Sequence, residues 1–220
     1  MLEKTFLYSD LKAGDRIYKI IDEFIYPDLK DKGFKLKKSP LSLIRTLGQI
    51  EHTIHFQKNI HNSGNYKAAF DVSFHISFKS YKTWHLEKYN KSIINEAVAW
   101  QKAGRDIPNW SNDFTSSLWY DLAQTDNVKI IDVLKNNIMN YGLKYLDSYS
   151  DFQTSINTIK ENNHFYQTPL IYDFCLFLND KKQAAEILTW FDNAKLSGLT
   201  FNSDILENVE LRKNDISNWV

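Results

Sequence analysis

The sequence predicts an α+β protein, in which an N-terminal helix packs on an antiparallel β-meander of three or four strands and a helical C-terminal lobe follows. Three observations support this prediction: apolar residues at helical spacing near the N-terminus, strict alternation over 68–78, and helical spacing again from residue 125 onward. Alternation with a period of two indicates a strand with one buried face, whereas apolar residues three and four apart indicate an amphipathic helix.

The first expected element is a helix over about residues 11–32, in which Ile17, Ile21 and Phe24 fall on one face. Pro27 interrupts this helix. Because proline is tolerated in the first turn of a helix but not in its interior, we expect a kink or a restart there. Gly33 is the expected end, since glycine commonly follows the last helical turn.

Three strands are expected next, over 41–47, 50–58 and 68–78, with Gly48 and Gln49 as a tight turn. The third strand alternates without a break, which is typical of an antiparallel meander with one buried and one polar face. Its apolar face carries Phe70, Val72, Phe74, Ile76 and Phe78, and its polar face carries Ala69, Asp71, Ser73, His75 and Ser77. In the second strand, alternation places Thr53, His55 and Gln57 on the polar face.

The region 80–124 gives weaker patterns. We expect a helix over about 92–103, ending near Gly104, and a fourth strand within 117–124. The tryptophans of this region, Trp84, Trp100 and Trp110, are expected to cover an edge of the core.

The remaining chain has helical periodicity, and its helix boundaries carry capping signals. Asp126 is the expected cap of one helix, and Ser150 with Gln153 forms a capping box for the next. Further helices are expected at Pro169–Leu178, Asp180–Leu196 with Gly198 as its end, and Ser203–Lys213. These patterns divide the chain into an α+β domain, 1–124, and a helical lobe, 125–220, which we expect to pack as one unit.

Composition limits the environment of the protein. Cys175 is the only cysteine, so an intramolecular disulfide is impossible, and no run of about 18 apolar residues predicts a membrane span. The first ten residues lack the apolar segment of a signal peptide. We therefore expect a cytoplasmic protein that does not enter a membrane.

Charge is distributed unevenly along a chain whose net charge is zero. Residues 1–110 contain 18 Lys and Arg against 12 Asp and Glu, whereas residues 111–220 contain 9 against 15. Such asymmetry indicates either a binding face or two lobes that attract each other.

A segment of the chain resembles a bacterial family defined only as domain of unknown function 4304. The matching residues are Tyr26-Pro27-Asp28-Leu29-Lys30, Lys32-Gly33-Phe34-Lys35, Arg45, Phe56-Gln57-Lys58 and Phe70-Asp71-Val72, within residues 17–78. The resemblance covers about a third of the chain and implies no catalytic residue. It implies a small bacterial cytoplasmic protein, and some members resemble immunity proteins that neutralise a toxin encoded beside them.

The candidate site residues on the polar face are His55, Gln57, Asp71 and His75. Two imidazoles and a carboxylate are the parts of a transition-metal site or of an acid–base pair. A polar sheet face also collects such residues without any function. His52 is expected on the apolar side, so it cannot share a metal with His55, and no metal or cofactor is predicted.

Three other features have both a functional and a structural interpretation. Arg45 lies within an apolar strand and needs a carboxylate partner, which is either internal or on another protein. The lysines of Lys30–Lys38 are able to contact phosphates, but they also suit an edge strand that must stay soluble. Cys175 lies in an apolar segment and is expected to be a buried, inert thiol rather than a nucleophile.

These observations rank the function classes. No glycine-rich nucleotide motif, nucleophile elbow or paired CxxC occurs. The favoured hypothesis is a protein-binding module, immunity- or antitoxin-like, whose partner is a toxin-like or neighbouring gene product; abundant Tyr and Trp support it. The alternative is an enzyme that uses His55, Asp71 and His75, and a second alternative is nucleic-acid binding through Lys30–Lys38. The identity of the partner and the oligomeric state stay open.

Overall fold

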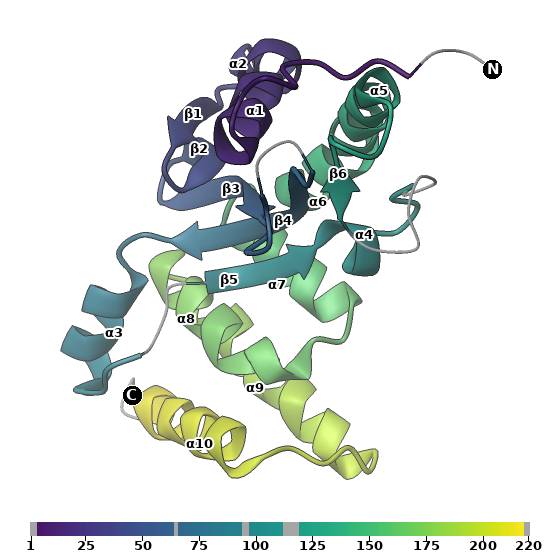
Figure 1. Cartoon of the computed structure of the whole chain (residues 1–220). Coiled ribbons are helices and arrows are strands. Elements are labelled where there is room, and N and C mark those ends of the chain that lie inside the picture. Colours follow the sequence, from purple (N-terminus) through teal and green to yellow (C-terminus); the bar gives the residue numbers. More distant parts are fainter. Residues whose placement is uncertain (1–3, 64–65, 94–96, 112–118, 218–220) are drawn as a thin grey trace. The chain divides into compact units, whose positions relative to one another are not determined.

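The computed structural model describes residues 4–63, 66–93, 97–111 and 119–217 and shows an α+β protein (Figure 1). The chain divides into two compact units, 1–147 and 148–220. The first unit combines helices with an antiparallel sheet, and every described element of the second unit is a helix. The predicted fold class is confirmed.

The sheet is antiparallel, and its strands follow the order of the chain from β1 to β5. The short β6 also pairs with β4, beside the start of that strand. The strands are β1 Lys35–Lys38, β2 Leu41–Leu47, β3 Ile50–Lys58, β4 Ala69–Phe78, β5 Ala97–Lys102 and β6 Tyr120–Asp121. The meander predicted over 41–78 is confirmed, and the sheet is wider than the predicted three or four strands.

The helix predicted over 92–103 is wrong for residues 97–102, and residues 94–96 lie outside the described part of the chain. The structure has strand β5 in this region, between helices α3 (Tyr81–Tyr89) and α4 (Ala103–Asp106). The alanines of β5 favour a helix in isolation, but the far side of β4 offers a row of hydrogen-bonding groups that β5 pairs. Within the predicted fourth strand, only Tyr120 and Asp121 form β6, and residues 117–118 lie outside the described part of the chain.

The N-terminal helical segment is continuous from residue 13 to residue 30 but changes its geometry before Pro27. It consists of α1 (Ala13–Ile20), a π-helical turn η1 (Ile21–Ile25) and α2 (Tyr26–Lys30). Pro27 lies in the first turn of α2, where its missing N–H costs little. Gly33 has φ 85°, and the Phe34 N–H donates to the Leu29 carbonyl, as expected of a glycine-terminated helix.

The core of the first unit lies on the apolar face of the sheet. Helix α5 (Asn127–Asn137), the π-helical turn η2 (Ile138–Gly142) and α6 (Leu143–Asp147) contribute to it. Phe74 of β4 is fully buried, and a Cβ built on Gly142 would lie 2.5 Å from its ring. Since these helices belong to the unit that contains the sheet, the division falls at 147/148 and not at the predicted 124/125.

A buried arginine connects distant segments of the first unit. Arg16 is 2% exposed and donates to the carbonyls of Leu7 and Leu122, each at 2.8 Å, and to Asn127 Oδ1 at 3.0 Å. The Asn127 Oδ1 also accepts from the Leu7 N–H at 2.9 Å. Burial lowers the pKa of the Arg16 guanidinium, while the Asp121 charge opposes this. Arg16 thus fixes the N-terminal segment and the start of α5 to α1.

The second unit consists of short helices with side-chain caps. They are α7 Phe152–Glu161, η3 Phe165–Gln167, α8 Thr168–Phe177, α9 Lys181–Leu196 and α10 Ser203–Ser217. The predicted capping box is wrong by one residue: Asp151, not Ser150, caps α7 by accepting from the Thr154 N–H at 2.7 Å. Serine and aspartate are similarly good caps, and Asp151 is the cap because its extended backbone directly precedes the first helical residue, Phe152. Gly198 ends α9 with φ 95°, as predicted.

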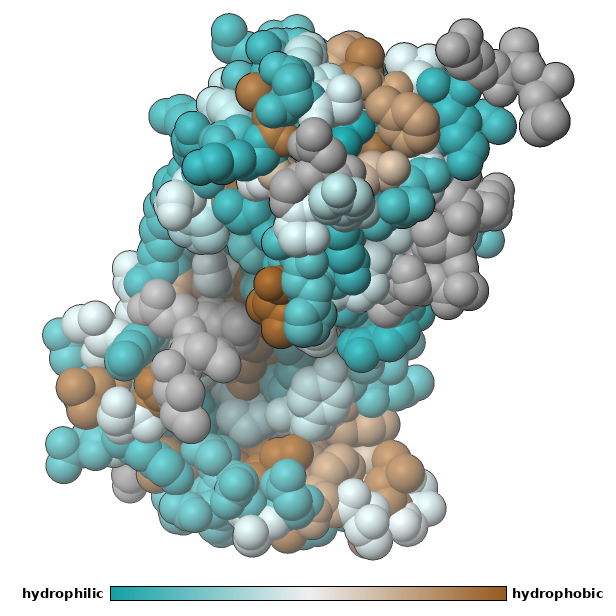
Figure 2. Space-filling view, in the orientation of Figure 1, coloured by the Kyte–Doolittle hydropathy of each residue, from teal (hydrophilic) through white to brown (hydrophobic). Residues whose placement is uncertain are grey.

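Exposed apolar side chains are scattered over the surface. Figure 2 shows hydrophobic atoms in small groups among hydrophilic ones on the face in view. The most exposed examples are Ile60 at 89% and Leu196 at 85%, which belong to different units. No helix in the described ranges is long and apolar enough to cross a membrane.

Candidate functional site on the polar face of the sheet

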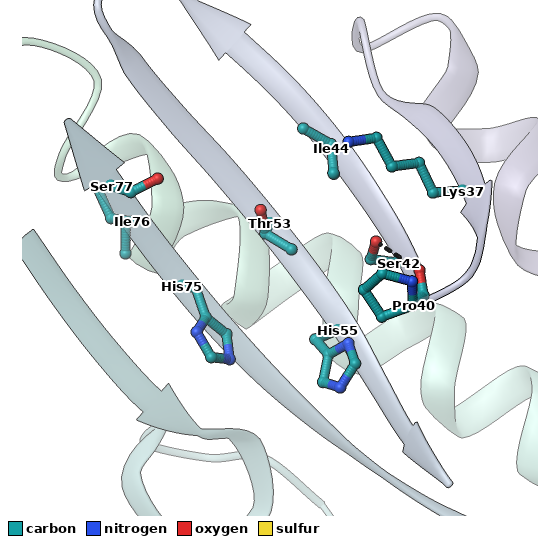
Figure 3. Close-up of a pocket in the computed structure, with 9 residues that line it drawn as sticks. All are labelled: Lys37, Pro40, Ser42, Ile44, Thr53, His55, His75, Ile76 and Ser77. Carbon is teal, nitrogen blue, oxygen red and sulfur yellow. Dashed lines mark hydrogen bonds between the residues drawn. The ribbon is translucent and has the colours of Figure 1, made fainter. Parts of the chain in front are cut away.

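Strand register brings the two predicted histidines together on one face of the sheet. His55 of β3 lies opposite Ser73 of β4, and His75 lies opposite Thr53, so the histidines are diagonal neighbours. Their ring centroids are 6.1 Å apart, with the planes nearly perpendicular. Figure 3 shows both imidazoles on the same side of adjacent strands. Alternation along each strand predicted this side, and pairing places the two residues in contact.

A third aromatic residue extends the pair across the sheet. Trp100 of β5 lies opposite His75, with ring centroids 6.0 Å apart, and its side chain is 46% exposed. The Arg105 guanidinium lies 5.7 Å from the Trp100 ring centroid and forms a two-point ion pair with Asp106. We call His55, His75 and Trp100 the aromatic row. It crosses three strands.

A hollow of about 630 Å³ lies beside the aromatic row. Its lining comes from β1–β4 and the β1–β2 turn, and includes Lys37, Thr53 and both histidines (Figure 3). The Ser42 hydroxyl also lines it but donates to the Pro40 carbonyl at 3.0 Å. The hollow therefore combines apolar walls with a lysine and two imidazoles.

Both histidines favour the neutral form. Burial lowers the pKa of His55, although the Asp71 charge and a hydrogen bond to the Leu41 carbonyl oppose this shift. Burial also lowers the pKa of His75, and the neighbouring His55 lowers it further. The His75 Nε2 lies 3.0 Å from the Ser73 hydroxyl oxygen, within hydrogen-bonding distance. Both shifts favour the neutral form of the rings at neutral pH.

The lowered pKa values predict that acid destabilises the fold. A histidine whose folded pKa lies below its unfolded value of about 6.5 binds fewer protons when folded, so stability falls as pH drops through that range. We expect the unfolding free energy to decrease between about pH 7 and pH 5, and the double change His55→Gln/His75→Gln to reduce this slope. Denaturant titrations at several pH values measure it. His61 is exposed in the loop after β3, so His61→Gln is the control and should leave the slope unchanged. An unchanged slope in the double variant would contradict the assignment of the pH dependence to His55 and His75.

Asp71 is paired and does not join the histidines directly. Its side chain is 1% exposed, and the Lys102 ammonium nitrogen lies 2.7 Å from its Oδ2. Apart from this ion pair, neither carboxylate oxygen of Asp71 accepts a hydrogen bond from the described residues. Gln57 lies opposite Asp71 in the register and is exposed. Among the described residues, no group of three or more His, Cys, Asp or Glu side chains is suitable for a metal ion.

Arg45 lies on the opposite face of the sheet and has an internal carboxylate partner. Its Nη2 lies 2.5 Å from Asp147 Oδ1 and 3.0 Å from His52 Nδ1, and its guanidinium lies over the Phe34 ring at 4.8 Å. His52 is fully buried, as predicted for the apolar side. These contacts give Arg45 a structural role at the end of α6, away from the aromatic row.

The lysines of Lys30–Lys38 do not lie on one surface. Lys35 and Lys37 lie opposite Ile44 and Ser42, on the polar face of β1. Lys38 alternates to the other side, 3.5 Å from Asp15 and 5.0 Å from the Tyr18 ring. Nucleic-acid binding through this stretch stays a prediction, which a steep loss of binding with added salt would test.

The buried thiol is confirmed. Cys175 has no exposed surface, and burial raises its pKa to about 12. Its Sγ lies 3.5 Å from Gln183 Oε1. A thiol with this pKa has almost no thiolate at neutral pH, so nucleophilic chemistry at this position is not supported.

Comparison with known proteins gives no relative from which a role could be transferred. No family model matches the chain, and neither the curated proteins nor the solved structures contain a match. The resemblance to domain of unknown function 4304 therefore stays a prediction. Trp100, which the sequence assigned to the edge of the core, is the residue that sequence reasoning missed; identifying β5 as a strand would have placed it beside His75.

Proposed function

We propose that the chain is a protein-binding module and that the aromatic row is the centre of its binding surface. The observation that carries the proposal is Trp100, 46% exposed and in contact with His75 next to a hollow of about 630 Å³. Tryptophan is strongly enriched among residues that dominate interface energetics, and a neighbouring hollow gives a partner side chain a place to insert. The neutral histidines add hydrogen-bonding groups without the cost of burying a charge.

The charges around the aromatic row favour an acidic partner. Lys35 and Lys37, at the β1 end of the polar face, are exposed and form no ion pair with the described residues. The acidic residues of this face are already paired: Asp71 with Lys102 and Glu51 with Lys79, at 2.7 and 2.9 Å. The uncompensated charge is therefore positive, which would attract and orient a negatively charged surface.

The resemblance to domain of unknown function 4304 supports a narrower form of this proposal. Some members of that family resemble immunity proteins, so the partner would be a toxin-like protein encoded by a neighbouring gene in a bacterium. The complex would form in the cytoplasm, and neutralisation by binding requires no catalytic residue in this chain.

Affinity capture with matched variants tests the proposal. The tagged wild-type chain is expected to retain one acidic protein from native lysate in near-equal amount. Trp100→Ala should reduce its capture by about 30-fold or more, since truncating a central interface tryptophan typically costs at least about 2 kcal/mol.

Tyr66 supplies the control, because its side chain is 84% exposed and lies in the loop between β3 and β4. Tyr66→Ala removes an exposed aromatic ring elsewhere in the same unit and should leave capture unchanged. Equal capture by the wild type and Trp100→Ala, or no retained protein at all, would contradict the proposal.

One observation favours acid–base catalysis as a second candidate. His55 and His75 are adjacent, uncharged at neutral pH and located at a hollow, and such imidazoles are competent to transfer protons. Screening of ester and phosphodiester substrates with the wild type and with His55→Ala/His75→Ala tests it. Turnover lost in the folded double variant would support catalysis, and equal turnover would eliminate it.

A further inference from the structure

The ends of two strands bring lysines to the beginning of helix α1. In β3, every second side chain from His52 to Phe56 is buried on the helix-covered face, and by the same alternation Lys58 points to that face at the end of the strand. Lys38, the last residue of β1, also lies on this side. Lys12 directly precedes α1. Three lysines from separate segments of the first unit therefore lie at the border of its apolar core.

A hollow of about 320 Å³ lies among these lysines. The three lysines line it together with Gly14, Asp15 and Tyr18. Because Gly14 has no side chain, the Lys58 side chain lies close to it: a Cβ built on Gly14 would be 3.5 Å from Lys58 Nζ and 3.7 Å from its Cδ. Pockets for small molecules have volumes of about 300–1,000 Å³, so this hollow has room for a small ligand.

The positive charge of the hollow is only partly compensated. Lys12 and Lys58 form no ion pair with the described residues. The carboxylate in the lining, Asp15, lies 3.5 Å from Lys38 Nζ, but both of these side chains are more than half exposed. Ion pairs with such exposure are weak, so an anion in the hollow is able to compete for Lys38. The lining as a whole has an excess of two positive charges.

We propose that this hollow, the lysine pocket, binds a phosphate group, either the free ion or one carried by a small molecule. Lysine ammonium groups donate charge-assisted hydrogen bonds to phosphate oxygens. The excess of two positive charges matches the charge of about −1.5 to −2 that a phosphate monoester has at neutral pH, whereas a single carboxylate would leave part of the excess uncompensated. Lys12, Lys38 and Lys58 surround one hollow and do not follow a groove, which favours a single phosphate over a nucleic-acid strand.

Titration of the purified full chain with phosphate compounds, followed by its backbone amide NMR signals, tests the pocket. The probes are inorganic phosphate and ribose phosphate, and ribose is the uncharged control. The signals of Gly14 and Asp15 should shift with both phosphates and not with ribose. Tighter binding of ribose phosphate would identify a sugar phosphate as the ligand, and equal binding would identify the free ion. Unchanged signals at about 10 mM of either phosphate, where even a site with a Kd of about 1 mM is occupied, would overturn the proposal.

Charge variants distinguish the pocket from a general attraction of anions. Lys58→Gln should weaken phosphate binding at least about fivefold, because it removes one charge-assisted hydrogen bond. Lys129 is exposed on α5 and does not line the hollow, so Lys129→Gln removes the same charge and should leave the affinity unchanged. Asp15→Asn should strengthen binding at least about twofold, because it removes a repulsive charge and releases Lys38, whereas Asp132→Asn on α5 should not. Equal effects of Lys58→Gln and Lys129→Gln, or of Asp15→Asn and Asp132→Asn, would overturn the proposal.

A short single-stranded oligonucleotide completes the set of probes. If it shifts the Gly14 and Asp15 signals at a lower concentration than ribose phosphate does, the pocket belongs to a nucleic-acid surface, and the assignment to a small ligand is overturned. Weaker binding of the oligonucleotide would support that assignment. The lysine pocket lies on the other face of the sheet from the aromatic row, and these probes include no protein partner. Failure of this proposal would therefore leave the proposed function untouched, and failure of the proposed function would leave the pocket untouched.

Discussion

Replacing Arg212 with leucine is expected to destabilise the unit 148–220 by about 3–5 kcal/mol, the usual cost of leaving one member of a buried ion pair without its partner. Arg212 is 1% exposed and Asp173 is fully buried. Two guanidinium nitrogens of Arg212 donate to the two oxygens of Asp173, at 3.2 and 2.5 Å. Arg212 also donates to the carbonyls of Pro169 and Asn208, each at 3.0 Å. The substitution thus leaves a buried carboxylate and two carbonyls without this donor.

The next residue in the chain provides the control. Lys213 lies 2.7 Å from Asp192, but both side chains are partly exposed. Such pairs contribute about 0–1 kcal/mol, so Lys213→Ala should change stability little. Denaturant unfolding measures both variants. Adding Asp173→Leu to Arg212→Leu should restore part of the loss, because it removes the uncompensated charge. A change in Arg212→Leu no larger than that in Lys213→Ala would contradict the role of the pair.

The second large effect is expected at Phe74, where truncation to alanine should cost about 3–5 kcal/mol. The Phe74 ring has no exposed surface and packs edge-to-face with Trp110 and Tyr145, at centroid distances of 5.5 and 6.1 Å. Removing it leaves a cavity beneath the helical layer that supports β4, the strand that carries His75.

The close contact between Gly142 and the Phe74 ring allows a second test of the packing at Phe74. An added Cβ at Gly142 would lie 2.5 and 2.7 Å from two atoms of the Phe74 ring, so Gly142→Ala should cost about 1–3 kcal/mol through overpacking. At Gly14 the nearest atom to an added Cβ is Lys58 Nζ at 3.5 Å, an ordinary contact, so Gly14→Ala is the control. In a Phe74→Leu background, Gly142→Ala should cost less. Additive effects in this double-mutant cycle would show that the two residues do not interact.

The sequence predicted the parts of the fold that depend on local patterns. The alternation of β4 predicted that Phe70, Val72, Phe74, Ile76 and Phe78 face the core, and all five are buried, although Ala69, Asp71 and Ser73 of the other face are buried too. Gly33 and Gly198 marked helix ends because both have positive φ, which glycine adopts without strain. These features are determined by a few neighbouring residues, so they can be predicted from the local sequence without the tertiary structure.

Features that depend on pairing were not predictable in the same way. The segment Ala97–Lys102 contains good helix formers, and its strand conformation results from the unpaired side of β4. Likewise, Ser150 and Asp151 are both suitable caps for α7. Asp151 is the cap because its extended backbone directly precedes the first helical residue. In both cases strand pairing or backbone geometry, and not the intrinsic preference of the residues, determines the structure.

The candidate site was predicted in part. Alternation placed His55 and His75 on the polar face, and the strand register brought them into contact. The pairing of Asp71 with Lys102 and of Arg45 with Asp147 could not be read from the sequence, because the partners are 31 and 102 positions away. Those pairings decide that neither charged candidate joins the aromatic row.

Hydroxyl-radical footprinting of the chain with its captured partner tests the central claim most directly. The modification rates of the Trp100, His55 and His75 side chains are compared with the rate of Tyr66, in the free chain and in the complex. Binding at the aromatic row predicts strong protection of Trp100 and of both histidines, with an unchanged rate at Tyr66. Unprotected row residues in a formed complex would place the interface elsewhere and contradict the account.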